Sequence, residues 1–249
     1  MSEPKWLVDF QILRQHPGDK PHFKIYPLEV DPEENVLDAI ERIWAKKDRT
    51  LTFRHACHHS TCGVCGMRVN GVEKLTCITA IKSVTKNGGI VRVEPLRNFT
   101  VLSDLVVDMG PFFRHMGETR FNSVAPVGYA SLPFEPDPTN SIPLERLVDC
   151  IECGLCISAC PAATTNAEYS GPAALAAIQL MLTQNFSPDL IALADHDNGA
   201  WRCHSAFECS EVCPSNVDPA WRIMNLRRRV VGHRFKSLFK FPKQEKQHA

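Results

Sequence analysis

The sequence contains no long hydrophobic run. No stretch approaches the roughly 18 consecutive apolar residues that a membrane-spanning helix needs. The N-terminus has neither an apolar signal core nor an Arg- and Ser-rich transit segment. We therefore expect the chain to stay in the compartment where it is made. The Met directly before the first strand-like segment argues against a processed mitochondrial subunit.

The chain also lacks net charge, with 28 basic and 28 acidic side chains. The charge is uneven, because residues 101–220 carry 4 basic and 15 acidic residues and residues 221–249 carry 9 and 1. No segment interleaves basic with aromatic residues, so no nucleic-acid partner is expected. The basic tail predicts either contact with anionic lipid or an acidic protein face, or a solvated tail; it includes Arg227, Arg228, Arg229, Lys236 and Lys240.

The first 103 residues have the pattern of a small α+β domain. Short runs with strand-like alternation surround one amphipathic helix, which is typical of a β-grasp fold. The expected elements are strands at Trp6–Ile12, His22–Tyr26 and Ile90–Val93, a helix capped by Asn35 with Leu37, Ile40 and Trp44 on one face, and a hairpin turn at Asn70–Gly71.

From residue 104 onward the pattern becomes helical, and Pro and Gly separate the segments. We expect an all-α domain over 104–249, entered through a loop-rich stretch at 115–142. The expected helices are Leu105–Met109, Leu144–Val148, Ala173–Leu182, Pro188–Ala194 and Pro219–Val230.

The eleven cysteines are the main chemical feature of the chain. Their number is odd, and they form three tight groups rather than being spread along the sequence. A chain without a secretion signal keeps its thiols reduced and uses them for metals. The cysteines therefore predict metal centres rather than disulfides.

The first group has gaps of four, two and eleven residues and consists of Cys57, Cys62, Cys65 and Cys77. This is the spacing of a plant-type [2Fe–2S] site. Three thiolates on one tight loop converge on the cluster, and the fourth comes from a neighbouring strand. Gly63 and Gly66 allow the loop to curl with its amides pointing inward. A zinc site is the alternative, although zinc seldom uses these gaps.

His58 and His59 lie inside this loop. A Rieske centre needs two His in place of two Cys. All four cysteines are present and a second Cys-x-His pair is missing. We therefore interpret both histidines as exposed loop residues.

The second group, with gaps of two, two and three, is the run of a bacterial ferredoxin that ends in Cys-Pro. It consists of Cys150, Cys153, Cys156 and Cys160. The third group, Cys203, Cys209 and Cys213, repeats this run except that Ala206 stands where a cysteine would fall.

In two-cluster ferredoxins the fourth cysteine of each run binds the other cluster. This rule assigns Cys150, Cys153, Cys156 and Cys213 to a [4Fe–4S] cluster. Cys160, Cys203 and Cys209 then remain for the other cluster. Three thiolates beside Ala206 favour [3Fe–4S], and a [4Fe–4S] cluster with a ligand other than cysteine is the alternative.

These motifs resemble the iron–sulfur subunit of the succinate dehydrogenase and fumarate reductase family (succinate:quinone oxidoreductases). The resemblance covers nearly the whole chain and the order of its two domains, a plant-type ferredoxin domain and a helical ferredoxin domain. The stretches that carry it are Arg54–Gly66, Leu75–Thr79, Cys150–Cys156 and Cys203–Pro214.

The resemblance implies an electron relay of the tricarboxylic acid cycle with no catalytic residue on this chain. A flavoprotein partner would interconvert succinate and fumarate on a covalent FAD, and membrane-anchor subunits would bind quinone. Single electrons would pass through [2Fe–2S], [4Fe–4S] and [3Fe–4S] in turn. The complex would lie on the cytoplasmic face of a bacterial cell membrane.

By the same resemblance, the quinone would sit beside the [3Fe–4S] cluster, near Pro161, Thr165, His204 and Ala206. His204 would donate to a quinone oxygen or stabilise the reduced cluster, or simply pack beside it. Many family members have a tryptophan where this chain has Thr165, so the resemblance leaves the quinone contacts at this position open.

Three other functions remain to be separated from this one. A fumarate reductase would run the same relay in reverse, and a thiol or heterodisulfide reductase would use a similar helical ferredoxin arrangement. A zinc-stabilised binding module would be colourless and free of iron.

Overall fold

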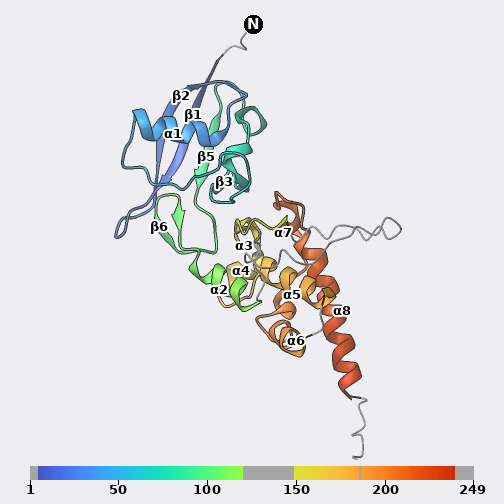
Figure 1. Ribbon diagram of the computed structural model, residues 1–249. Helices are drawn as coiled ribbons and strands as arrows, with labels where there is room; N and C mark the ends of the chain where they lie inside the picture. Colours follow the sequence, from blue (N-terminus) through green and yellow to red (C-terminus); the bar gives the residue numbers. More distant parts are fainter. Residues whose placement is uncertain (1–4, 120–148, 185–186, 239–249) are drawn as a thin grey trace, which may run out of the picture.

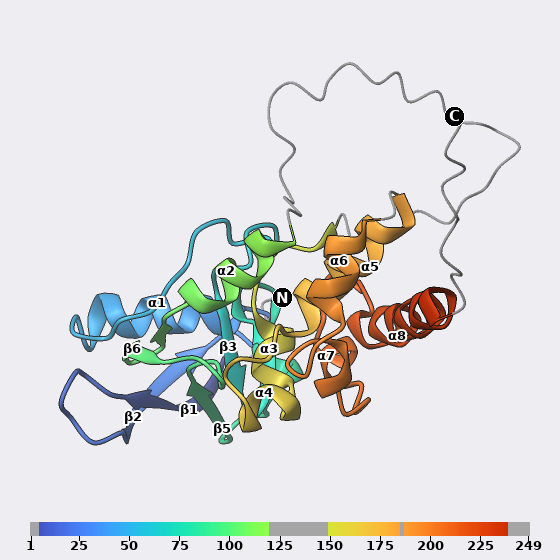
Figure 2. The same cartoon turned by 90° about the horizontal axis from the view of Figure 1, so that it is seen from below.

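The computed structural model describes residues 5–119, 149–184 and 187–238. A sheet forms in the first part of the chain and helices dominate the described residues after Gly110. Figures 1 and 2 show the sheet at one end of the molecule and α5, α6 and α8 at the other, with α3 and α4 between them. The predicted order of a sheet region followed by helices is confirmed.

The main sheet has five strands in the order β2-β1-β5-β3-β4. The first hairpin and the hairpin at Asn70–Gly71 flank β5, which runs parallel to β1 and antiparallel to β3. The strand bounds are β1 Trp6–Arg14, β2 His22–Val30, β3 Gly66–Val69, β4 Val72–Leu75 and β5 Ile90–Glu94.

Helix α1 (Val36–Lys46) packs on one face of this sheet. Every second side chain of β1 is buried from Val8 onward, as expected for a strand with one face on a core. Asn35 and Asp38 form the capping box at the start of the helix, so the predicted cap is confirmed. Trp44 is 38% exposed under the guanidinium of Arg49, because another side chain of α1, Ile43, takes the buried position.

The prediction of a helix at Leu105–Met109 is wrong. The chain instead forms a short hairpin of β6 (Val101–Ser103) and β7 (Val106–Val107), and α2 (Gly110–Glu118) follows. The turn of this hairpin contains Asp104 at φ +44°, a conformation incompatible with a helix. Tertiary contacts of the buried Asp104 carboxylate hold this turn, and local periodicity does not reveal them.

The second part of the chain consists of short helices around one longer helix. The expected helix at Pro188–Ala194 is confirmed, and the helices at 173–182 and 219–230 are found with longer bounds. The described residues do not include the helix expected at 144–148. They also do not include the prolines of the expected entry loop, at 126, 133, 136 and 138. The bounds are α3 Leu155–Ala159, α4 Pro161–Thr165, α5 Pro172–Gln184, α6 Pro188–Ala194, α7 Glu208–Glu211 and α8 Pro219–Leu238; single 3₁₀ turns are η1 Thr76–Ile78, η2 Ile81–Ser83 and η4 Ala200–Arg202.

Within the described part of the chain, none of the helices combines the length and the apolar composition of a membrane span. The two parts of the molecule share one core, in which Leu75 and Leu96 pack in the same cluster as Leu155 and Leu180. Polar contacts strengthen this junction, because the hydroxyl of Ser158 donates to Glu73 at 2.8 Å. The sheet and the helices are therefore held in a fixed relation.

A buried ion network ties the end of β1 to the β6–β7 hairpin. Arg14 donates to Asp104 at 3.0 Å and to Asp48 at 2.6 Å, and the backbone N–H groups of Gln15 and Thr52 also donate to Asp104. Burial alone would raise the pKa of Asp104, but the hydrogen bonds from Arg14, Thr52 and Gln15 lower it overall. At Asp48 as well, burial raises the pKa and hydrogen bonds lower it, and the hydrogen bonds have the larger effect, so the pKa of Asp48 is also lowered.

Asp104→Asn is expected to lower the free energy of unfolding by about 2 kcal/mol at neutral pH, because a buried charged acceptor is lost. The native pKa values of both carboxyls lie below the unfolded value of about 3.9. The network therefore stabilises the fold above that pH and loses its contribution as the pH falls through the lower native values. Urea unfolding at pH 7 and below pH 4 should show the difference between the two proteins shrinking in acid. Asp9→Asn, on the opposite face of β1, is the control, and an equal loss there would contradict the assignment.

Candidate metal centres

The first cysteine group lies on the loop before β3 and on η1. The loop passes through three residues with positive φ, His58, Ser60 and Gly63, so it curls back on itself. The backbone N–H of Cys62 donates to Cys57 Sγ at 3.4 Å. Backbone N–H groups, that of His59 first, lower the pKa of Cys57 to about 6. The loop thus presents amide donors to sulfur, as the sequence predicts.

Cys65 and Cys77 are the buried half of this group. Thr76 joins them, because both its backbone N–H and its hydroxyl donate to the carbonyl of Cys65, the hydroxyl at 3.0 Å. Burial raises the pKa of Cys77 to about 11, and a hydrogen bond and charge interaction with Cys65 add to the rise. The structure therefore brings all the predicted residues of this set together, but Cys77 lies on η1 directly after β4 and not within a strand as expected.

Cys150, Cys153, Cys156 and Cys213 line one common pocket. Burial raises the pKa of Cys150 to about 11 and that of Cys153 to about 12, and it raises the pKa of Cys156 well above its ordinary value. The backbone N–H of Val217 donates to Cys213 Sγ at 3.4 Å. Cys213 lies more than fifty residues away in sequence, so its place here agrees with the crossed pairing expected from the sequence.

The remaining three cysteines, Cys160, Cys203 and Cys209, line a second pocket together with Ala206. Burial raises the pKa of Cys209 to about 12, and the Cys160 and Cys203 thiols add to the rise. The backbone N–H of Ser205 donates to Cys203 Sγ at 3.4 Å.

The end of α3 separates these two pockets. Cys160 follows the last helical residue with φ −75° and ψ 119°, so the chain turns away from the pocket of Cys156 and Pro161 starts α4. The side-chain amide of Asn98 donates to three carbonyls at this helix end, those of Ile157, Ser158 and Cys160, at 2.7–3.2 Å. Sequence reasoning missed Asn98, because its partners lie about sixty residues away.

The residues around the two pockets fit clusters of iron and sulfide. Soft thiolates are the ligands that iron–sulfur clusters take. Buried thiols with raised pKa values need nearby positive charge to ionise, and iron supplies it. The buried Tyr169 hydroxyl lines the three-cysteine pocket and approaches the Cys203 thiol without reaching hydrogen-bond geometry, so it faces a place where a sulfur acceptor would lie.

The loop that carries Cys57, Cys62 and Cys65 (the first cysteine loop) packs directly on the segment that carries Cys150 and Cys153 (the second cysteine loop). A Cβ added to Gly63 would lie 2.8 Å from both Cys153 Cβ and the Ile151 carbonyl oxygen. A Cβ on Gly66 would lie 3.0 Å from Leu155. Glycine at position 63 therefore satisfies two needs, a φ of +70° and the close approach of two cysteine loops.

The residues expected near a quinone are only partly brought together. Pro161, His204 and Ala206 all line the three-cysteine pocket, and His204 is exposed. Thr165 lies at the end of α4 outside the lining of that pocket, where its hydroxyl donates to the Ala162 carbonyl and accepts from Arg202. Thr165 is thus placed to orient Arg202.

His58 and His59 are exposed, as predicted. The ring of Trp201 lies beneath Arg227 and Arg234, and its Nε1–H donates to Asp195 at 2.7 Å.

Two family models match the chain. A model described as a 2Fe-2S iron-sulfur cluster binding domain matches residues 9–114. A model described as a 4Fe-4S dicluster domain matches residues 146–217.

Curated proteins include relatives that match most of this chain. The chain is 37% identical over 250 residues to the fumarate reductase iron-sulfur subunit of Mycobacterium tuberculosis (strain CDC 1551 / Oshkosh), covering 94% of this chain and 97% of that protein. It is 31% identical over 236 residues to the mitochondrial succinate dehydrogenase (ubiquinone) iron-sulfur subunit 1 of Oryza sativa subsp. japonica, covering 88% and 80%. Among solved structures, a chain of the Mycobacterium smegmatis Sdh1 complex in the apo form matches with a TM-score of 0.78 and 25% identity, covering 93% of this chain and 98% of that one.

Proposed function

Because this chain belongs to the family of iron–sulfur subunits of fumarate reductases and succinate dehydrogenases, we propose that it is the electron-relay subunit of a quinone-linked succinate dehydrogenase. Clusters held at its three cysteine sets would carry single electrons between a flavoprotein partner, which holds FAD, and membrane quinone. The dicarboxylate chemistry belongs to the flavoprotein in this proposal.

In this proposal, each of the three cysteine sets holds a different type of cluster. The set of Cys57, Cys62, Cys65 and Cys77 holds [2Fe–2S]; that of Cys150, Cys153, Cys156 and Cys213 holds [4Fe–4S]; and that of Cys160, Cys203 and Cys209 holds [3Fe–4S]. The proposal includes a β-grasp ferredoxin domain over 1–103 and a helical ferredoxin domain over 104–249.

The observation that carries the proposal is the linear order of these sets. The first loop touches the second at Gly63 and Cys153, and the short helix α3 joins the second pocket to the third. A protein that only binds a stabilising metal has no need for three adjacent thiol sets. Electron transfer through the protein does need such a chain of close centres.

The quinone end of the relay is proposed at the mouth of the three-cysteine pocket. His204 and Ala206 line this mouth, and His204 is exposed, so it can donate to a bound quinone oxygen. Anchor subunits would cover this surface on the cytoplasmic side of a bacterial membrane. The basic helix α8, which Figure 1 shows projecting beyond the other helices, would lie against acidic lipid or protein.

The test is purification of the chain with its native partners, followed by assay of succinate-dependent quinone reduction. We expect a brown complex with activity and about nine iron atoms on this chain, from two, four and three. A colourless complex without iron would favour the alternative function of a zinc-stabilised binding module. An iron-containing complex that reduces no quinone with succinate would favour a thiol or heterodisulfide reductase relay.

Fumarate reduction is the second candidate, because five of the relatives with more than 30% identity are named fumarate reductase iron-sulfur subunits. The same complex, supplied with a low-potential quinol, would then reduce fumarate faster than it oxidises succinate with the corresponding quinone. Comparing both rates in one preparation separates the directions.

Tyr169→Phe is expected to lower the midpoint potential of the cluster in the three-cysteine pocket. Burial raises the pKa of Tyr169, and the Cys203, Cys160 and Cys209 thiols add to the rise, so the hydroxyl stays a neutral donor. Donors to cluster sulfur raise the potential. Loss of a hydrogen bond of about 1 kcal/mol corresponds to about 40 mV for one electron.

Potentiometric titration followed by electron paramagnetic resonance measures this shift, and the iron content should not change. Tyr26→Phe is the control, since Tyr26 lies in the buried Arg14 network. An unchanged potential in Tyr169→Phe would refute the role of the hydroxyl.

A further inference from the structure

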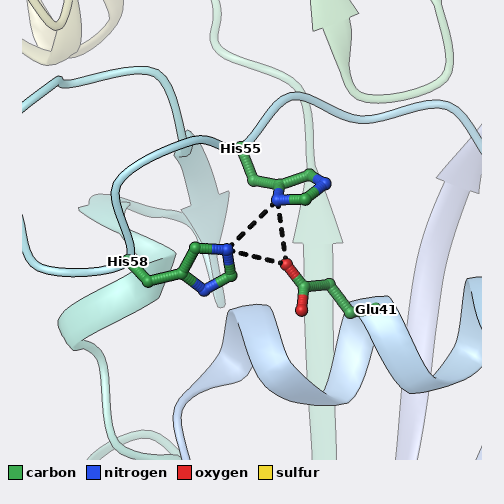
Figure 3. A group of neighbouring side chains, drawn as sticks. All are labelled: Glu41, His55 and His58. Carbon is green, nitrogen blue, oxygen red and sulfur yellow. Dashed lines mark hydrogen bonds and ion pairs between the residues drawn. The ribbon is translucent and has the colours of Figure 1, made fainter.

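Three side chains outside the cysteine sets converge beside the first cysteine loop. Glu41 projects from α1, and His55 and His58 come from the loop that leads into and past Cys57 (Figure 3). The Glu41 carboxylate oxygen and the two imidazole nitrogens point toward one another in Figure 3. The relay proposed above uses none of these groups.

The distances among the three ligand atoms form a nearly regular triangle. His55 Nδ1 lies 3.0 Å from Glu41 Oε1, and His58 Nε2 lies 3.2 Å from the same oxygen. The two nitrogens are 3.2 Å apart. Zinc bonds of about 2.0–2.1 Å at tetrahedral angles put ligand atoms about 3.3 Å apart. The triangle therefore has the size of one face of a tetrahedral site.

Hydrogen bonding satisfies this arrangement only in part. Glu41 Oε1 is inaccessible to solvent and has no partner in hydrogen-bond geometry, although both nitrogens are close to it. One imidazole can donate to the other across the 3.2 Å between their facing nitrogens, but that single bond leaves Glu41 Oε1 without a donor in hydrogen-bond geometry. With both facing nitrogens unprotonated, three lone pairs would converge on one point, which is the arrangement that a metal ion requires.

The local structure holds both rings in this orientation. The ring of Phe53 stacks on His55 with centroids 5.2 Å apart and an interplanar angle of 21°. His58 adopts φ +61°, a conformation that costs a residue with a side chain about 1–2 kcal/mol. This conformation turns its imidazole toward α1 instead of toward bulk solvent.

We propose that Glu41, His55 and His58 form a binding site for one divalent transition-metal ion of the zinc class. Two imidazoles and a carboxylate suit zinc, whereas calcium and magnesium take oxygen ligands. The side chains are 30%, 43% and 40% exposed, so an ion can enter and a water can complete the coordination. A bound ion would clamp the first cysteine loop to α1.

The experiment uses the full chain with its clusters in place, washed with a weak chelator and titrated with Zn²⁺. Bound zinc is measured by elemental analysis and its ligands by zinc-edge X-ray absorption. We expect one zinc per chain with nitrogen and oxygen neighbours at about 2.0–2.1 Å and no sulfur at about 2.3 Å. Sulfur neighbours would mean that the zinc sits in a cysteine set, and they would overturn the proposal.

Variants separate this site from other surface histidines. Glu41→Gln and His58→Ala are each expected to weaken zinc binding at least tenfold. His59→Ala, at an adjacent exposed histidine, should bind as the unaltered chain does. Glu41 belongs to α1 and is not part of the cysteine loop, so Glu41→Gln should retain its iron even if His58→Ala does not. Unchanged affinity in Glu41→Gln would refute the site.

Discussion

Ala206→Cys is expected to abolish the oxidised-state paramagnetic resonance signal of the [3Fe–4S] cluster. Ala206 lines the pocket of Cys160, Cys203 and Cys209, so a thiol there would supply the fourth ligand that a [4Fe–4S] cluster needs. The iron content of the chain should rise from about nine to about ten. Quinone reduction should fall at least tenfold, because changing the cluster type changes the potential of the last centre.

The matched control for this change is Ala206→Val, which adds a side chain of similar size without a ligand atom. It should keep about nine iron atoms and the original signal. If Ala206→Cys also keeps the signal, the third set does not hold [3Fe–4S] as proposed. If the unaltered chain lacks the signal, the alternative of a [4Fe–4S] cluster with a different fourth ligand is favoured.

Gly63→Ala is expected to disrupt the junction between the first and second cysteine loops. Its φ of +70° would cost an alanine about 1–2 kcal/mol. Its Cβ would lie 2.8 Å from Cys153 Cβ, and such overpacking costs a further 1–3 kcal/mol or so. The total loss of unfolding free energy is about 2–5 kcal/mol. Because the loops must move apart, quinone turnover by the assembled complex should fall at least tenfold.

Gly88→Ala separates backbone strain from the clash. Gly88 has φ +74°, nearly the same as Gly63, but a Cβ there would meet nothing within 4 Å. It should lose only about 1–2 kcal/mol and keep full turnover. Thermal unfolding and succinate-to-quinone assays compare the two variants. Equal effects in both would mean that the contact with Cys153 is unimportant.

Features that depend on local patterns could be predicted from the sequence. The alternation in β1, the helix cap at Asn35 and the turn at Asn70–Gly71 all depend on neighbouring residues, and all are found. The grouping of Cys213 with the second cysteine run followed from a known spacing rule, and the structure brings those residues into one pocket.

Features that depend on distant partners were missed or wrong. The stretch at 105–109 has helical periodicity, but the buried Asp104 network fixes a hairpin there. Thr165 follows Pro161 on the same short helix, yet it faces Arg202 and not the three-cysteine pocket. The convergence of Glu41 with His55 and His58 needs the packing of α1 beside a loop, which spacing alone does not reveal.

The amide of Asn98 limits how this protein can be recombined with its relatives. The residue comes from the sheet-bearing half, but all three carbonyls that it satisfies belong to the helical half, at the turn between two cysteine pockets. A chimera that joins the halves of two relatives would keep this turn only if the stretch around residue 98 came from the same parent as α3. The stretch around residue 98 and the end of α3 therefore have to be inherited together, although each half carries its own cysteine motifs.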